Sequence, residues 1–441
     1  MLRSRDQTVH PLPSVEPVDG CAMSLEKVSI IGAGHCGCAH TIYLLRHQVA
    51  DVLLAAHPSH SRSLTTIARR GYIESSGTYE GSFAPQTTTD ITEAVRFSKT
   101  LFVILPSSGD ELIVEELRKL NDELGQHIII FISGNWIARR ASQVLRARYI
   151  VETATAPYAC RYPGGIGSIS GIKRVLPVAA LPSPMSADLR EHIGRFFPQP
   201  LDWYDNCFKL GMASITGVIH PAPILLNADW IAQTNGELPL YTHCLTVPSV
   251  LEMVESLDRD RRRIAQAYGF SVFSTLELMN LYYGTNYHSL ESFAMHSVAH
   301  SQITVGADGL QSRGVTQDVP NVLVPWYLFG LRAGIDSRPM RVLIDFASEL
   351  NGEDYLTSGL TLDKLGLGHA SKEQIVDVYT SCTPQSPPSK RTARRNTIDT
   401  IPPVPVLVRM PNNRKIATLL RWNGPPEESP KPAVLEEEGG V

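Results

Sequence analysis

The stretch Ile30–His40, written IIGAGHCGCAH, supports two interpretations that lead to different folds. Its glycines, Gly32, Gly34 and Gly37, have the spacing G-x-G-x-x-G that is typical of a loop that binds the pyrophosphate of a dinucleotide. The same stretch contains two cysteines and two histidines, which are residue types that bind metal ions. The sequence on either side of the stretch decides between the two interpretations.

The glycine motif lies where a dinucleotide-binding fold requires it. The apolar run KVSIIGAG, which begins at Lys27, predicts a buried strand, and the residues from His35 onward have apolar side chains at helical spacing. A second apolar run, DVLLAA from Asp51, predicts the next strand. This order of strand, glycine loop, helix and strand is the context that makes the motif specific.

Each glycine has a physical role in such a loop. Gly32 allows a tight turn, Gly34 lets the backbone approach the pyrophosphate, and Gly37 lets the helix pack closely on the strand. The phosphates then lie over the helix N-terminus, where N–H groups are free. The predicted cofactor-binding loop comprises Gly32, Ala33, Gly34, His35, Cys36 and Gly37.

The metal interpretation fails on geometry. In a helix that turns by about 100° per residue, Cys36 and His40 share a face. His35 and Cys38 then point in other directions, so that four ligands cannot converge on a tetrahedral ion. We therefore predict no metal site here and expect these side chains to line the loop or to pack against it.

The remaining sequence predicts two domains between two tails. Short, continuously apolar runs alternate with helical stretches over residues 25–203, which predicts an α/β Rossmann-type domain with a parallel sheet covered by helices. Residues 204–382 consist of helical segments with hardly a strand candidate and predict an all-α domain for catalysis and substrate binding. Residues 1–24 and 383–441 are predicted to be a flexible and a disordered tail, the latter because it is rich in Pro, Ser and charge.

Composition limits the class of protein. The 441 residues carry a formal net charge of −4, which gives no field that would attract the whole chain to nucleic acid or to an anionic membrane. The sequence contains no run of eighteen or more apolar residues, so no transmembrane helix is predicted. The seven cysteines have no repeated spacing, which favours a reducing, cytoplasmic location. The sequence leaves the oligomeric state open.

The end of the second predicted strand bears on the choice of cofactor. Enzymes that bind NAD usually place an acidic residue there for the ribose 2′-hydroxyl, whereas a basic environment suits the 2′-phosphate of NADP. Asp51 lies too early in the strand, and the segment that follows contains His57 and Arg62 but no acid. This favours NADP over NAD. The alternative for Arg62 is that it is a solvated residue at the start of a helix and does not bind the cofactor.

Three polar residues of the helical region are candidates for chemistry. His220 precedes Pro221 in an apolar segment, where proline interrupts a helix, and it is either a proton carrier or a core histidine. Arg313 is either a fork that binds a carboxylate or a surface residue, and Asp318 is either the partner of an imidazole or a helix N-cap. Spacing alone leaves these alternatives open.

Several ordered stretches together resemble the opine dehydrogenase family, which includes octopine and nopaline dehydrogenases. The resemblance extends over nearly all of residues 26–380. It rests on GAGHCG at 32–37, ETATAPYACR at 152–161, VIHPAPILLNADW at 218–230, VPSVLEMVESLDRDRRRIAQAYG at 247–269, RGVTQDVPNVLVP at 313–325 and GLTLDKLGLG at 359–368.

The resemblance implies a Rossmann domain, a helical domain like that of 6-phosphogluconate dehydrogenase, and the NAD(P)H-dependent reductive condensation of an amino acid with a 2-oxo acid. The catalytic histidine of the family falls on His220, its partner aspartate on Asp318 and its substrate-carboxylate arginine on Arg313. Gln317 and Gly314 depart from the family pattern and leave the substrates open. The alternatives are a dehydrogenase of 2-oxo or 3-hydroxy acids similar to ketopantoate reductase, and a dinucleotide-sensing protein without catalysis.

Overall fold

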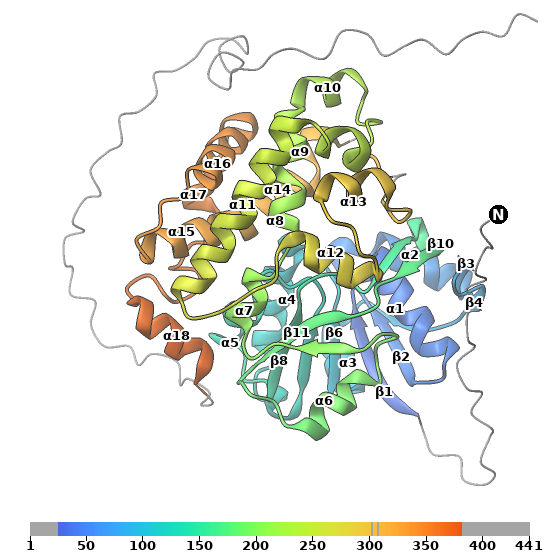
Figure 1. Ribbon diagram of the computed structural model, residues 1–441. Coiled ribbons are helices and arrows are strands. Elements are labelled where there is room, and N and C mark those ends of the chain that lie inside the picture. The colour runs from blue at the N-terminus through green and yellow to red at the C-terminus, as the bar shows by residue number, and fades with distance from the viewer. Residues whose placement is uncertain (1–24, 301–302, 307, 382–441) are drawn as a thin grey trace, which may run out of the picture. The chain divides into compact units, whose positions relative to one another are not determined.

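The apolar runs from the N-terminal half form the centre of an eight-stranded sheet (Figure 1). The computed structural model describes residues 25–300, 303–306 and 308–381. The two predicted tails lie outside the described residues. In spatial order the strands are β12 (Leu201–Trp203), β11 (Leu176–Leu181), β8 (Tyr149–Thr153), β7 (Ile128–Phe131), β6 (Thr100–Val103), β1 (Glu26–Ile31), β2 (Ala50–Ala55) and β5 (Gln86–Thr88).

Two features of the strands differ from the prediction of a parallel sheet. All neighbours in the large sheet are parallel except β8 and β11, which are antiparallel, so the sheet is mixed. The chain reaches β11 from a second, smaller sheet, whose strands in order are β4 (Gly81–Phe83), β3 (Ile73–Gly77), β10 (Ile166–Ile172) and β9 (Tyr158–Arg161). These strands are short and rich in Gly and Ser, which hides them from a pattern of continuous apolar residues.

Helices cover both faces of the large sheet, as the continuous apolar runs predict. Along β1, Ile30 belongs to the hydrophobic core on one face and Ile31 to the core on the other, and both are fully buried. The helical segments of this part are α1 (His35–Arg46), η1 (Pro58–His60), α2 (Arg62–Arg70), α3 (Ile91–Phe97), α4 (Ser107–Lys119), η2 (Leu124–Gln126), α5 (Ile137–Ser142), η3 (Pro163–Gly165) and α6 (Ala187–Gly194). The predicted α/β fold is confirmed.

Among the described residues after β12 the regular elements are all helical, apart from an isolated bridge between Pro239 and Thr304, and the predicted helical part is confirmed. The segment Cys207–Leu226 is long and apolar enough to cross a membrane, but 78% of it is buried inside the protein, as expected of a core segment. The helices are α7 (Cys207–Met212), α8 (Thr216–Ile219), α9 (Pro221–Leu226), α10 (Ala228–Gln233), η4 (Leu240–Leu245), α11 (Pro248–Ala267), α12 (Thr275–Tyr283), α13 (Leu290–His296), η5 (Gly309–Gln311), α14 (Arg313–Thr316), η6 (Val319–Leu323), α15 (Val324–Arg332), α16 (Arg338–Asn351), α17 (Tyr355–Ser358) and α18 (Lys372–Thr380).

The two parts share one hydrophobic core. Trp136, which precedes α5, is 1% exposed, and its ring lies 5.7 Å from that of Phe208 in α7 and 5.1 Å from that of Phe329 in α15. A Cβ atom on Gly211 would lie 2.6 Å from the indole of Trp136, so the ring rests directly on the backbone of α7. This packing holds the first helices of the helical part against the sheet (Figure 1).

Replacement of Gly211 by alanine is expected to destabilise the protein. The new methyl group would overlap the buried indole, and overpacking of this kind costs about 1–3 kcal/mol of unfolding free energy. Thermal unfolding followed by circular dichroism measures the effect. Gly194→Ala in α6 is the matched control, because no atom lies within 4 Å of its added Cβ. An unchanged Tm for Gly211→Ala would contradict the tight contact.

Candidate functional site

The glycine loop connects β1 to α1 at the carboxyl edge of the large sheet. Gly32 has φ +128°, and an added Cβ would lie 2.2 Å from the carbonyl oxygen of Ile104, at the end of β6. A Cβ on Gly37 would lie 1.8 Å from the carbonyl oxygen of Gly32. Gly34, in contrast, has no atom within 4 Å of the corresponding position. Two glycines are therefore required by the fold, while Gly34 faces open space.

This loop has the features of a pyrophosphate site. It lies between β2 and β6, the two neighbours of β1, where the strand order reverses and ligands of such sheets bind. Helix α1 has no acidic residue in its first turn, and Gly34 at its N-cap has no side chain to occupy the first N–H groups. Free amides at the N-terminus of a twelve-residue helix attract an anion. The residues present therefore fit the phosphates of a dinucleotide.

The cysteines and histidines of the loop diverge. His35 Nδ1 accepts a hydrogen bond of 2.9 Å from the backbone N–H of Tyr162. The thiol of Cys38 donates to the carbonyl of Ala33 at 3.7 Å, and burial raises its pKa to about 12. His40 is fully buried, its Nδ1 lies 3.0 Å from the hydroxyl of Tyr158, and burial lowers its pKa to about 3. No group of three or more His, Cys, Asp or Glu side chains within the described ranges could hold a metal ion.

The end of β2 contains the residues that the sequence predicts for cofactor choice. His57 is the N-cap of η1, and its Nδ1 accepts from the backbone N–H of Ser59 at 3.2 Å. Its Nε2 lies 4.0 Å from the carboxylate of Glu116 in α4, which also pairs with Lys119 at 2.7 Å. Arg62 is the exposed first residue of α2. These contacts place a mixed set of charges near the strand end.

His220 and Asp318 meet although 98 residues separate them in sequence. The Nδ1 atom of His220 lies 2.7 Å from Oδ2 of Asp318, and the side chains are 28% and 5% exposed, respectively. His220 occupies the break between α8 and α9 that Pro221 imposes, and Asp318 directly precedes η6. A carboxylate only accepts hydrogen bonds, so Nδ1 carries the proton and Nε2 of the neutral imidazole has the free lone pair.

Arg313 stands beside this pair. An added Cβ on the next residue, Gly314, would lie 3.0 Å from Cβ of His220 and 2.6 Å from Cδ1 of Ile224, so only glycine allows this approach. Arg313 is exposed, and its charge acts on His35, whose pKa is lowered mainly by burial and also by Arg313. Arg313 takes part in no ion pair within the described part of the chain. Gly314, which departs from the family pattern, therefore has a steric reason: any side chain at this position would collide with Ile224 and His220.

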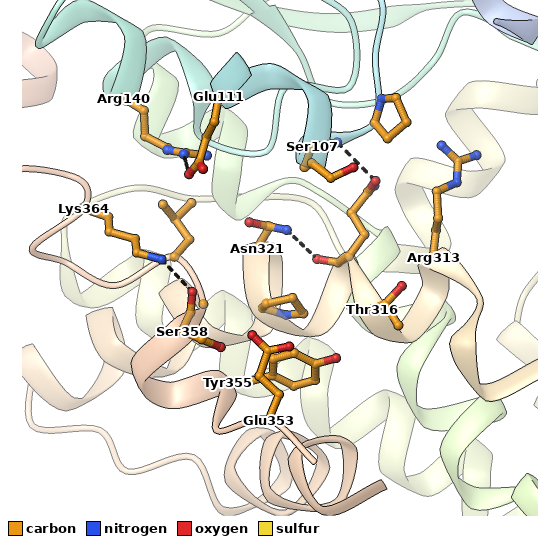
Figure 2. Close-up of a pocket in the computed structure, with 16 residues that line it drawn as sticks. Ser107, Glu111, Arg140, Arg313, Thr316, Asn321, Glu353, Tyr355, Ser358 and Lys364 are labelled. Atoms are coloured by element: carbon orange, nitrogen blue, oxygen red, sulfur yellow. Dashed lines mark hydrogen bonds and ion pairs between the residues drawn. The ribbon is translucent and has the colours of Figure 1, made fainter. Parts of the chain in front are cut away.

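A polar pocket of about 390 Å³ adjoins Arg313 (Figure 2). Gln317 crosses it: its Oε1 accepts from the backbone N–H of Ser107 at the start of α4 at 3.3 Å, and its carbonyl accepts from Asn321 at 3.0 Å. Neither His220 nor Asp318 lines the pocket. Its lining comprises Pro106, Ser107, Ser108, Glu111, Arg140, Arg313, Thr316, Gln317, Pro320, Asn321, Glu353, Tyr355, Ser358, Gly359, Leu360 and Lys364.

A second histidine of the helical part, His300, was not among the residues predicted from the sequence. The ring of His300 lies 4.4 Å from that of Tyr241 and 4.6 Å from that of Tyr283, and its Nδ1 lies 2.7 Å from Oγ of Ser297. Burial, together with the charges of Lys173 and His220, lowers the pKa of His300 to about 4. His300 is therefore neutral at pH 7 and packs among aromatic side chains of the helical part.

Comparison with known proteins gives consistent similarities. A family model described as the α-helical domain of NAD/NADP octopine/nopaline dehydrogenase matches residues 203–351. The chain is 27% identical over 360 residues to vitopine synthase of Allorhizobium ampelinum, covering 80% of this chain and 99% of that protein. It is 28% identical over 348 residues to an opine dehydrogenase of Arthrobacter sp., covering 77% and 94%. The fold is similar to that of octopine dehydrogenase solved with NADH and agmatine, with a TM-score of 0.65, 14% identity and coverage of 80% and 98%.

The glycine loop gives a paired test. Gly37→Ala is expected to lower both the Tm and the affinity for dinucleotide, because its methyl group would displace the Gly32 carbonyl. Gly34→Ala is expected to leave the Tm unchanged and to weaken dinucleotide binding by about tenfold or more, because only a bound pyrophosphate would meet the new methyl group. Thermal shift and fluorescence titration with NADH and NADPH measure the two effects. Full affinity in Gly34→Ala would place the pyrophosphate elsewhere.

Proposed function

The chain belongs to the opine dehydrogenase family of NAD(P)-dependent oxidoreductases, and we propose that it catalyses the reductive condensation of an amino acid with a 2-oxo acid to a secondary-amine dicarboxylate. The observation that carries the proposal is the hydrogen bond between His220 and Asp318, with Arg313 five residues before Asp318. Gln317, which precedes Asp318, accepts from the backbone N–H of Ser107 after β6, the strand next to β1 and its glycine loop. This arrangement combines a proton carrier, its orienting carboxylate and an anion-binding group.

We propose that the glycine loop and the first turn of α1 hold the dinucleotide. Gly32 and Gly37 maintain the turn, and the open space at Gly34 leaves room for the pyrophosphate. When bound, the reduced dinucleotide supplies the hydride that converts an imine to a secondary amine. The protein contributes position, proton transfer and exclusion of water.

Arg313 is proposed to anchor the 2-oxo acid. Its guanidinium is not engaged by a carboxylate of the described residues, so its planar fork is free for the two oxygens of a substrate carboxylate. Gly314 lets the backbone of α14 lie against His220, which keeps the anchored substrate close to the imidazole. The carbonyl carbon of the oxo acid is then presented to the attacking amine and to His220 together.

His220 is proposed to move protons between the reacting groups. As the amine nitrogen attacks the carbonyl carbon, Nε2 of His220 takes the proton that the nitrogen releases. The imidazolium then gives this proton to the former carbonyl oxygen, which becomes the hydroxyl of the carbinolamine. A second transfer of the same kind moves the remaining amine proton to this hydroxyl, which leaves as water while the carbon–nitrogen double bond forms. Asp318, held 2.7 Å from Nδ1, stabilises the imidazolium between these steps.

Replacement of His220 by glutamine is expected to reduce kcat by about 10²–10⁴-fold without a change in the Kd for NADH or NADPH, because general acid–base catalysis is lost while the glycine loop is intact. Asp318→Asn should act in the same direction, because the amide no longer fixes the tautomer or stabilises the imidazolium. His192→Gln is the matched control, because His192 also pairs with a carboxylate, that of Glu26 at 3.1 Å, but lies in α6 and not in the candidate site. Unchanged turnover in His220→Gln would remove the basis of the proposal.

The substrates are best identified by a matrix of amino acids and 2-oxo acids with NADH and NADPH, read as the loss of absorbance of the reduced nicotinamide. L-Arginine and pyruvate are a suitable first pair, because octopine dehydrogenase has been solved with each of them. Oxidation of the dinucleotide should require both the amine and the oxo acid. Oxidation with an oxo acid alone would instead support a simple dehydrogenase of 2-oxo acids, and binding without any turnover would support a dinucleotide sensor.

We further propose that NADP is preferred over NAD. The support is the lack of an acidic residue in the segment from Val52 to Arg62, together with the basic side chains that follow β2. Arg62→Gln is expected to lower the affinity for NADPH relative to NADH by about tenfold, and Arg69→Gln at the other end of α2 is the control. Fluorescence titration measures both ratios. A ratio unaffected by Arg62→Gln would assign that residue to the solvent.

We also propose that the enzyme is cytoplasmic. The cysteines that the structure describes, Cys36, Cys38, Cys160, Cys207 and Cys244, are all free thiols. Free thiols in these numbers are typical of a reducing compartment, where disulfide bonds do not persist. The proposed partners, which follow from the proposed reaction, are two small molecules, an amino acid and a 2-oxo acid.

A further inference from the structure

Lys173, directly after β10, is a cation held beside aromatic rings. Its Nζ donates a hydrogen bond of 2.8 Å to the carbonyl of Ala156, and the ammonium lies 5.9 Å from the ring centroids of both Tyr282 and Tyr283 in α12. Burial lowers its pKa to about 8, so that the amine is still mostly protonated at pH 7. The neighbouring residue, Arg174, bonds through its backbone N–H to the carbonyl of Tyr282 at 2.8 Å, which fixes the strand end against α12.

The charge of Lys173 has no counter-ion in the described part of the chain. Lys119, Lys209 and Lys372 each lie within 4.0 Å of a carboxylate, but Lys173 takes part in no such pair there. The thiols nearest to it do not compensate, because burial raises the pKa of Cys36 well above its usual range and that of Cys160 to about 11. Lys173 is half-buried beside aromatic rings, and an ammonium that has lost part of its hydration without gaining an anion is a favourable site for a ligand that supplies one.

The surroundings of Lys173 connect it to both halves of the candidate site. Although burial raises the pKa of Cys36 at the start of α1, Lys173 and Arg313 both act to lower it, so Cys36 is within electrostatic reach of the two cations. His300 is in turn affected by Lys173 and by His220. The geometry agrees with these interactions. Ala156, whose carbonyl accepts from Lys173, follows β8 by three residues and so lies at the carboxyl edge of the large sheet, the edge at which the glycine loop connects β1 to α1. The ring of Tyr283 beside Lys173 lies 4.6 Å from that of His300.

The proposed condensation of an amino acid with a 2-oxo acid brings together two molecules that each carry a carboxylate. Arg313 is assigned to the 2-oxo acid, and the carboxylate of the amino acid needs a second cation when water is excluded from the site. Resting on that proposed function, we propose that Lys173 binds the carboxylate of the amino acid substrate and thereby selects amino acids over simple amines. The aromatic rings of Tyr282 and Tyr283 hold the ammonium in place for this contact.

Substitution of Lys173 by glutamine tests the proposal. The measurement is kcat/KM for the amino acid found in the substrate matrix and for the amine that lacks its carboxylate, which for L-arginine is agmatine, at saturating oxo acid and dinucleotide. In Lys173→Gln, kcat/KM for the amino acid should fall by about 10- to 100-fold, while that for the amine changes little. The ratio of the two should therefore move toward one. Lys173→Arg, which keeps the charge, should restore much of the selectivity.

Three readouts can overturn the assignment. A parallel loss for amino acid and amine, a higher KM for the oxo acid, or a weaker Kd for NADH and NADPH in Lys173→Gln would each give Lys173 another role. Lys209→Gln is the matched control, because Lys209 in α7 also lies beside an aromatic ring, 5.4 Å from that of Tyr204, but is already paired with Asp205 at 3.1 Å. Failure of the proposed function is recognised separately, since unchanged turnover in His220→Gln concerns proton transfer and not the selectivity ratio.

Discussion

The contact between Trp136 and the backbone at Gly211 determines where the candidate site can form. Because α7 has no side chain at this position, the indole packs directly on the helix, and Trp326 donates a hydrogen bond of 3.0 Å to the carbonyl of Gly211 from the other side. A close-packed interior of this kind does not slide. Helix α7 is thereby fixed against the sheet, and the break between α8 and α9 that contains His220 follows eight residues after Met212.

The parts of the fold that local sequence determines were predictable. Gly32 needs a positive φ, Gly37 needs the absence of a Cβ, and both requirements are properties of single residues that the motif exposes. The central strands were equally recognisable, because burial on both faces demands an unbroken apolar run. The interruption at Pro221 follows from proline itself, which lacks the N–H of a continuing helix.

The pairings that depend on tertiary structure could not be predicted from spacing. Nothing local brings His220 to Asp318 across 98 residues, and only the resemblance to a family suggested that they belong together. The small sheet escaped because its strands carry Ser and Gly instead of an apolar period. No sequence pattern singles out Lys173, and its position beside Tyr282 and Tyr283 arises from contacts between segments more than a hundred residues apart.

The sulfur groups around the glycine loop have a consequence for the redox behaviour of the protein. A thiolate, and not a thiol, reacts with peroxide or with an alkylating reagent. Burial keeps Cys36, Cys38 and Cys160 protonated at neutral pH. The two cysteines beside the proposed cofactor loop are therefore poor nucleophiles at neutral pH, although a loop with this composition suggests reactive thiols.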